Sequence, residues 1–142
     1  MRFWDSSALL PLCVFEPRST TIRRLAQEDE AMAVWWATLV ECQSAVARLR
    51  REGSLGEDGE NQVRETLAEL QQAWTEMEPS DDIRTLAGQL LLRHPLRAAD
   101  SLQLAAALLW SGRSPGGMEF VCLDARLRDA ARGEGFTVVP EP

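Results

Sequence analysis

The sequence predicts a three-layer α/β/α sandwich, in which helices cover both faces of a central parallel sheet. Short apolar runs alternate with amphipathic stretches from one end of the 142 residues to the other, which favours crossover connections over a helical bundle. The 45% hydrophobic and 26% charged residues are typical of a globular protein with a core of its own. Because no linker, repeat or low-complexity segment divides the chain, we expect one domain over 1–142.

The first half of the chain predicts two strands, each followed by helices. A strand over 2–4 ends at Asp5, and the following helix is capped by Asp5 or Ser6 until Pro17 ends it. A second helix is expected from 19 to about 27, and a second strand over 31–36. The next helix starts with Thr38 as its cap and ends at Gly53, after three arginines that complement the helix dipole.

The second half predicts three more strands between helices. A helix over 60–73 forms an αα-hairpin with the preceding one around 53–59, which can project from the sheet and bind a partner. A short edge strand is expected within 74–79, and Ser80 opens a helix that reaches Leu91. A helix rich in Ala and Leu then covers 98–110, and strands over 119–123 and 135–139 flank a helix over 126–132.

The composition excludes several kinds of chemistry. All 15 basic residues are Arg, so neither a Walker A phosphate loop nor a Schiff base can form. The net charge of −7 argues against a general nucleic-acid coat protein, although a nuclease whose acids bind metal remains compatible with it. No apolar run approaches the roughly 20 residues that span a bilayer, and charges interrupt any signal-peptide core, so we expect a cytoplasmic protein. The scattered Cys13, Cys42 and Cys122 indicate three buried thiols.

Four acidic residues stand at the edges of apolar segments. Asp5 and Asp124 end strands, while Glu41 and Asp100 lie in the first turns of helices. Each has a structural explanation as well as a functional one. Asp5 can cap a helix, Glu41 can form a capping box with Thr38, and Asp100 can complement a helix dipole.

A shared metal site is the functional explanation for these acids. The carboxyl ends of parallel strands and the helix starts that follow them can meet at one edge of the sheet. Unit charges about 4 Å apart repel by roughly 4 kcal/mol at an effective dielectric of 20, and Mg²⁺ or Mn²⁺ with oxygen ligands relieves that repulsion. Such a site supports hydrolysis of phosphodiesters.

Two other candidate sites are rejected. The pattern Gly112-x-Ser114-x-Gly116 matches a nucleophile elbow formally, but a helix precedes it and no histidine follows it. His94, the only histidine, stands before Pro95 and is expected to be a loop residue rather than a general base.

Four segments resemble the PIN domain, in the form found in VapC toxins of bacterial toxin–antitoxin pairs. They are residues 5–9 (DSSAL), Glu41 after the second strand, residues 96–105 (LRAADSLQLA) and residues 122–127 (CLDARL) followed by Gly135-Phe136. The resemblance covers the whole chain in the family's order. Ser101 replaces the alanine commoner there after the third acid, a small change that should not disturb metal binding.

This resemblance implies a Mg²⁺- or Mn²⁺-dependent endoribonuclease. Its catalytic and metal-binding residues would be Asp5, Glu41, Asp100 and Asp124, with Asp129 as an alternative fourth acid and Ser7 in a supporting role. The resemblance also implies a homodimer and a cognate antitoxin that covers the site. A non-catalytic PIN-like module that binds or regulates a partner is the alternative. A phosphoacceptor domain with Asp5 as nucleophile is disfavoured for two reasons. The residue two positions after Asp5 is not a second acid, and the chain contains no lysine.

Arginines and tryptophans add candidates for binding. Arg97 could meet an RNA phosphate or form an ion pair with a site carboxylate. The run that contains Arg48, Arg50 and Arg51 could follow an RNA backbone or simply be a solvated helix end. Trp35 and Trp36 face opposite sides of a strand, so one of them could line the dimer or antitoxin surface.

Overall fold

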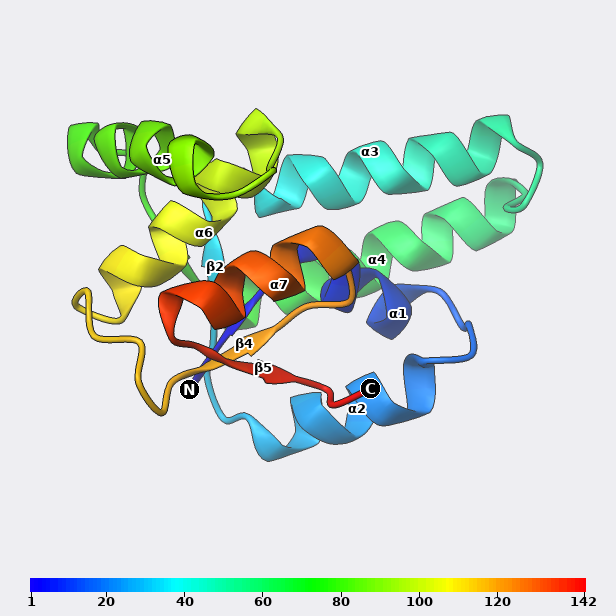
Figure 1. Cartoon of the computed structure of the whole chain (residues 1–142). Helices are drawn as coiled ribbons and strands as arrows, with labels where there is room; N and C mark the ends of the chain where they lie inside the picture. Colours follow the sequence, from blue (N-terminus) through cyan, green and yellow to red (C-terminus); the bar gives the residue numbers. More distant parts are fainter.

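A computed structural model describes all 142 residues, and it has the predicted α/β layers (Figure 1). Five short strands form one parallel sheet in the order β3-β2-β1-β4-β5. Their bounds are β1 (Arg2–Trp4), β2 (Met32–Trp35), β3 (Thr75–Met77), β4 (Glu119–Val121) and β5 (Thr137–Val139). At the centre of the sheet Phe3 is in register with Ala33 of β2 on one side and with Phe120 of β4 on the other. The prediction of a parallel sheet is confirmed.

Seven helices follow or connect the strands. They are α1 (Ser6–Cys13), α2 (Ser19–Glu28), α3 (Thr38–Arg51), α4 (Glu57–Ala73), α5 (Asp81–Arg93), α6 (Ala98–Trp110) and α7 (Ala125–Glu134). Helix α4 begins three residues before the predicted start, because Gly56 is its N-cap and acidic residues fill a first turn where the helix dipole favours them. None of the helices is both long and apolar enough to cross a membrane.

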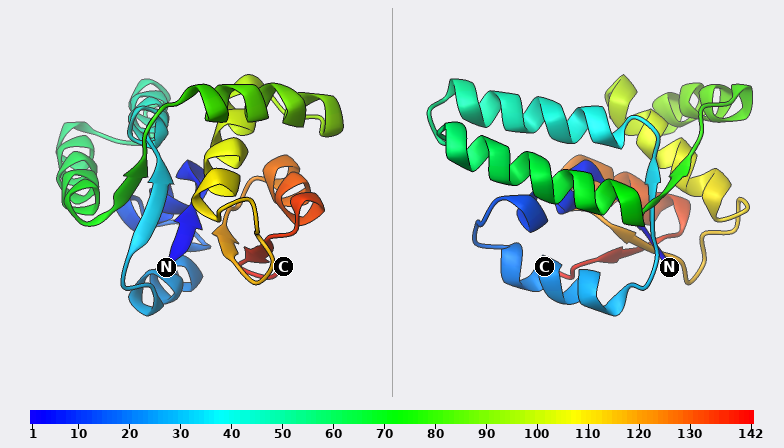
Figure 2. Two further views of the ribbon diagram at one scale, coloured as in Figure 1. Left: turned by 90° about the vertical axis from the view of Figure 1, so that its left-hand side faces the viewer. Right: turned by 180° about the vertical axis from the view of Figure 1, so that it is seen from behind.

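The alternation of side chains along the strands divides the core into two halves. Phe3 and Phe120 point to the face covered by α5, α6 and α7. Trp4 and Val121 point to the other face, covered by α1, α2 and parts of α3 and α4. Figure 2 shows these helices on the two sides of the sheet. Since both faces are covered, the central residues of β1, β2 and β4 are apolar and buried.

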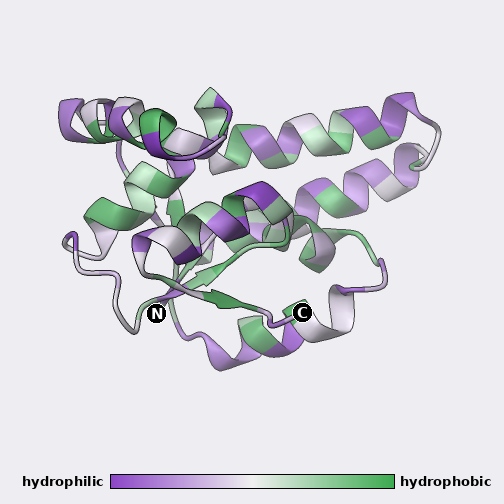
Figure 3. Ribbon diagram, viewed as in Figure 1, coloured by the Kyte–Doolittle hydropathy of each residue, from purple (hydrophilic) through white to green (hydrophobic).

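The α3–α4 hairpin extends away from the sheet, and its tip is hydrophilic (Figure 3). Its apolar residues are used inside the chain, since Val46, Val63 and Leu67 are almost fully buried. The predicted role of the hairpin in binding a partner stays a prediction, and it now concerns the charged outer surface rather than these apolar faces.

The prediction of three buried thiols is wrong at one position. Cys42 and Cys122 are buried, whereas Cys13 at the end of α1 is only half-buried because the chain leaves the core there. Burial raises the pKa of the Cys42 thiol to about 12, so this thiol is protonated near neutral pH.

Candidate functional site

Asp5 is the most deeply buried of the four candidate acids, with 4% of its surface exposed. It directly follows β1, and its backbone N–H donates to the carbonyl of Val121 at 2.9 Å. Its Oδ2 accepts from the backbone N–H of Ser7 at 3.2 Å and from Ser7 Oγ at 2.5 Å. Asp5 is therefore the N-cap of α1, and the cap prediction holds for Asp5 rather than for Ser6.

Ser7 connects two segments that are far apart in the sequence. Its hydroxyl donates to Asp5 and accepts from the backbone N–H of Leu123 at 2.9 Å. The thiol of Cys122 lies 3.6 Å from Asp5 Oδ2. These contacts fix the Asp5 carboxylate against the end of β4, so Ser7 lies where a supporting residue is expected.

Glu41 lies in the first turn of α3, and its predicted capping box is wrong. Ala37 is the N-cap of α3 and no side chain caps the helix, because Thr38 is already its first residue and is buried against α6. The Glu41 carboxylate instead accepts from the side-chain amide of Gln103 at 3.2 Å. The same amide nitrogen lies 2.8 Å from Asp5 Oδ1, which places Glu41 beside Asp5.

Asp100 and Asp124 line the same hollow, and the charges of Asp124 and Asp5 both act on Asp100. Asp100 is partly exposed in the first turn of α6. Asp124 follows β4, and it caps α7 by accepting from the N–H of Leu127 at 3.0 Å. Asp129, the alternative fourth acid, is 81% exposed and pairs with Arg132 at 3.4 Å, so it does not join this group.

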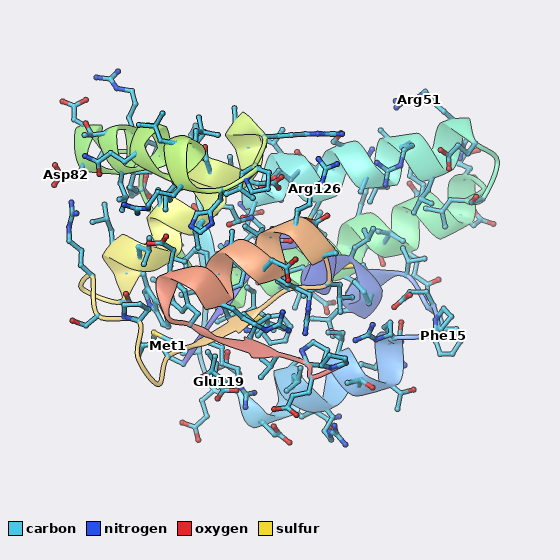
Figure 4. All side chains as sticks on the ribbon, in the orientation of Figure 1. Met1, Phe15, Arg51, Asp82, Glu119 and Arg126 are labelled. Carbon is cyan, nitrogen blue, oxygen red and sulfur yellow. The ribbon has the colours of Figure 1, made fainter.

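Two hollows open beside these acids. One, of about 520 Å³, is lined by Ser7, Glu41 and Arg48 among others. The other, of about 460 Å³, is lined by Asp100 and Asp124 together with Arg97 and Arg126. Figure 4 shows Arg126 at the N-terminal end of α7. Each hollow thus combines at least one carboxylate of the site with at least one guanidinium group.

The acids of the site disfavour one another's ionisation. Burial, followed by the charges of Asp5 and Asp100, raises the pKa of Glu41 to about 8. Burial and then the charges of Asp124 and Asp5 raise the pKa of Asp100, although Arg97 opposes this. Burial raises the pKa of Asp5 against the lowering effect of its hydrogen bonds from Ser7, Gln103 and Cys122. The acids therefore share one electrostatic environment.

The donor set fits a hard divalent cation in its chemistry, although the side chains do not form a closed coordination shell. No three His, Cys, Asp or Glu side chains are grouped so that they could hold a metal ion. None of the four acids has a basic group within 4.0 Å. Carboxylates that raise one another's pKa and lack a cationic partner offer the oxygen ligands that Mg²⁺ and Mn²⁺ prefer.

Sequence-based predictions concern two basic residues, and His94 lies outside the helices as expected. The Arg97 side chain is exposed and lies within 4.0 Å of no carboxylate, so the predicted close ion pair is not formed, although the charge of Arg97 lowers the pKa of Asp100. His94 is the C-cap of α5, and its Nε2 lies 2.6 Å from Glu134 Oε2 at the end of α7. His94 therefore lines neither hollow, and it links the ends of α5 and α7.

Comparisons with known proteins identify the architecture. VapC20 of Mycobacterium tuberculosis, described as a toxin that cleaves the sarcin–ricin loop, has a TM-score of 0.66 at 18% identity over 96% of this chain and 97% of that one. The fold is PIN-like. A chain of a toxin–antitoxin complex from Klebsiella pneumoniae has a TM-score of 0.64 at 18% identity over 99% and 97% of the two chains. The protein PAE2754 from Pyrobaculum aerophilum has a TM-score of 0.62 at 19% identity over 93% and 80%. No family model and no curated protein matches the sequence.

Gln103 is the residue of this PIN-like site that sequence reasoning missed. It lies three residues after Asp100 on the buried helix α6 and is fully buried itself. The available signal was a long polar side chain within a run of Leu and Ala, because such a side chain needs polar partners when it is buried. Only the fold shows that those partners are Asp5 and Glu41.

Proposed function

We propose that this chain is a divalent-metal-dependent endoribonuclease and the toxin component of a toxin–antitoxin pair. The observation that supports the proposal is that acids from four separate segments of a PIN-like fold affect one another's ionisation: Asp5 and Asp100 raise the pKa of Glu41, and Asp124 and Asp5 raise the pKa of Asp100. The similarity in fold to VapC20, a toxin that cleaves RNA, supports the same reaction class. The reaction would be hydrolysis of an RNA phosphodiester bond.

The residues that would hold Mg²⁺ or Mn²⁺ are Asp5, Glu41, Asp100 and Asp124. Such an ion supplies Lewis-acid stabilisation of the phosphate and activation of water. The chain's own residues hold the proposed ligands in place. Ser7 fixes the orientation of Asp5, and the N–H of Leu123 after β4 in turn holds Ser7. Because Glu41 and Asp100 have raised pKa values and must be ionised to bind a cation, binding would release protons and become tighter as the pH rises.

The arginines beside the hollows are suited to RNA phosphates. Arg97 and Arg126 line one hollow and Arg48 lines the other, so guanidinium groups lie on both sides of the acids. Exposed guanidinium groups bind phosphate oxygens without selecting a base sequence. Arg50 is already paired with Glu60 at 3.5 Å, and Arg51 lies far away at the tip of the hairpin (Figure 4), so we assign RNA contacts to Arg48, Arg97 and Arg126.

An antitoxin and a second copy of the chain are the proposed protein partners. The similarity to a chain of a toxin–antitoxin complex supports the first. Trp35 is buried, while Trp36 is 52% exposed and Val40, four residues later in the sequence, is 63% exposed. An exposed tryptophan suits a protein interface, and we propose Trp36 for the dimer.

The test is a paired cleavage assay on the wild type and Asp5→Asn. Each protein is incubated with total RNA and with a sarcin–ricin-loop hairpin, in Mg²⁺, in Mn²⁺ and in EDTA. We expect cleavage by the wild type that requires metal, and none by Asp5→Asn. The control is Asp129→Asn, which removes an exposed carboxylate outside the site and should cleave like the wild type.

Two results would contradict the proposal. Cleavage that persists in EDTA, or in Asp5→Asn at the wild-type rate, would exclude a metal site built on this carboxylate. Absence of both cleavage and Mn²⁺ binding in the wild type would instead favour the non-catalytic binding module.

A further inference from the structure

Gln103 occupies a core position that an apolar residue would fill at lower cost. Its side chain is fully buried within an apolar segment of α6, and burying an amide is unfavourable unless its donors and acceptor are satisfied. Its two N–H groups have carboxylate partners, with Nε2 at 2.8 Å from Asp5 Oδ1 and at 3.2 Å from Glu41 Oε1. The Thr38 hydroxyl lies 3.4 Å from the amide oxygen and 3.3 Å from the amide nitrogen, so each polar atom of the Gln103 side chain has a partner.

The two carboxylates depend on this amide to different degrees. Asp5 is also held by Ser7 through its second oxygen. The Glu41 carboxylate has no hydrogen-bond partner other than Gln103. Glu41 has a long side chain with several rotatable bonds, so the amide decides which of its rotamers faces Asp5.

We propose that Gln103 is a positioning residue that holds Glu41 beside Asp5 in the arrangement that receives the divalent cation. The inference rests on the proposed function, because it concerns the ligands of the proposed metal site. A neutral amide suits this task better than a basic residue. It donates to both carboxylates without cancelling their charge, so they remain attractive to a cation, whereas an arginine would compete with that cation.

The experiment measures Mn²⁺ binding to the purified full chain by isothermal titration calorimetry, without RNA. Gln103→Met keeps the length of the side chain and removes both donors. Outer-shell partners of metal ligands contribute about 10–100-fold to metal affinity, and we expect the Kd for Mn²⁺ to rise within that range. The matched control is Ser101→Ala on the same helix, since Ser101 is equally buried but its hydroxyl donates only to the Ala98 carbonyl at 2.8 Å. Its Kd should equal that of the wild type.

A double-mutant cycle separates positioning from a general loss of structure. In a Glu41→Gln background the amide no longer has a metal ligand to position on α3, so Gln103→Met should change the Kd by much less than it does in the wild type. Circular dichroism checks that each variant is folded. If Gln103→Met does not fold, Gln103→Asn replaces it, because the shorter amide keeps a polar group in the core but cannot reach both carboxylates. We expect it to weaken Mn²⁺ binding in the same sense.

The outcomes distinguish this inference from the proposed function. A folded Gln103→Met or Gln103→Asn protein with the wild-type Kd would overturn the positioning role while leaving the metal site intact. A loss of affinity that is equally large in the Glu41→Gln background would overturn it too. A wild-type protein that binds no Mn²⁺ would refute the metal site of the proposed function, and this inference with it.

Discussion

At the scale of single residues, Glu41 shows how the fold sets the properties of the site. Its carboxylate is held by one hydrogen bond from Gln103 and faces other acids. The sequence offered a local explanation, the capping box with Thr38, which fails because α3 starts at Thr38 itself. Its actual environment comes from β1 and α6, segments that no local pattern connects to it.

The raised pKa of Glu41 makes stability depend on pH. Burial and neighbouring charges raise this pKa from 4.5 to about 8, so the folded protein holds a proton that the unfolded chain has released. The free energy of unfolding should therefore fall as the pH rises from about 4.5 to about 8. Above that range the loss is complete. In EDTA, the loss of unfolding free energy between about pH 5 and about pH 9, measured by urea denaturation, should be smaller for Glu41→Gln than for the wild type.

The control for this pH dependence is Glu65→Gln, which changes an exposed glutamate on α4 and should lose as much stability as the wild type. Asp5 and Asp100 shift in the same direction, so some loss remains in Glu41→Gln. Equal losses in Glu41→Gln and the wild type would contradict the assignment.

Asp100→Asn separates the catalytic role of a carboxylate from its structural effect. It should abolish RNA cleavage because it removes a proposed metal ligand. Without metal it should melt at the same temperature as the wild type or higher, because it relieves the repulsion from Asp124 and Asp5 that raises the pKa of Asp100. Cleavage assays in Mn²⁺ and thermal melting in EDTA check the two parts. Full activity would be incompatible with the proposed site.

At the scale of elements, the sequence predicts the strands and most helices because their signals are local. Ser80 caps α5 as expected, with its hydroxyl accepting from the N–H of Ile83 at 3.2 Å. Apolar runs give the strands, and the acids that end β1 and β4 become the caps of α1 and α7. Two helix starts were not predicted correctly. At Thr38, tertiary packing outweighs the local cap signal. At Glu57, the acids of the first turn outweigh it.

Asp124 serves α7 as a cap and the site as a proposed ligand, and two substitutions separate these roles. Asn caps a helix about as well as Asp, so Asp124→Asn should lose RNA cleavage with little change in stability. Asp124→Ala should lose cleavage and also about 1 kcal/mol of unfolding free energy, because the N–H of Leu127 loses its partner. Urea denaturation of both variants checks the difference. Equal stability of the two would mean that the cap contributes nothing.

At the scale of the whole molecule, the site depends on the strand order. β1 lies between β2 and β4, so the segments that follow these strands meet beside Asp5, and α6 adds Asp100 and Gln103. The sequence predicts the acids and the class of sheet. It does not predict which acids are neighbours, because the order of parallel strands depends on contacts between distant segments.

The oligomeric state is a property of the whole molecule. We expect a dimer of about twice the chain mass of 15.8 kDa by size-exclusion chromatography with light scattering. Trp36→Ser should shift the mass towards the monomer, because it removes a large exposed apolar side chain. Phe15→Ser is the control, since Phe15 is also exposed, at 75%, but lies between α1 and α2. A monomeric wild type would contradict the prediction, as would a Trp36→Ser protein that remains fully dimeric.

The pairing of β1 with β4 has a consequence for how the protein is made. Asp5 needs the carbonyl of Val121, and Ser7 needs the N–H of Leu123, 116 positions later in the sequence. Chains emerge from the ribosome in order from the N-terminus, so an unfinished chain has Asp5 but not the strand that holds it in place. The site can assemble only after β4 has emerged from the ribosome. Until β4 has emerged, the ribosome that makes this proposed ribonuclease is not exposed to a complete site.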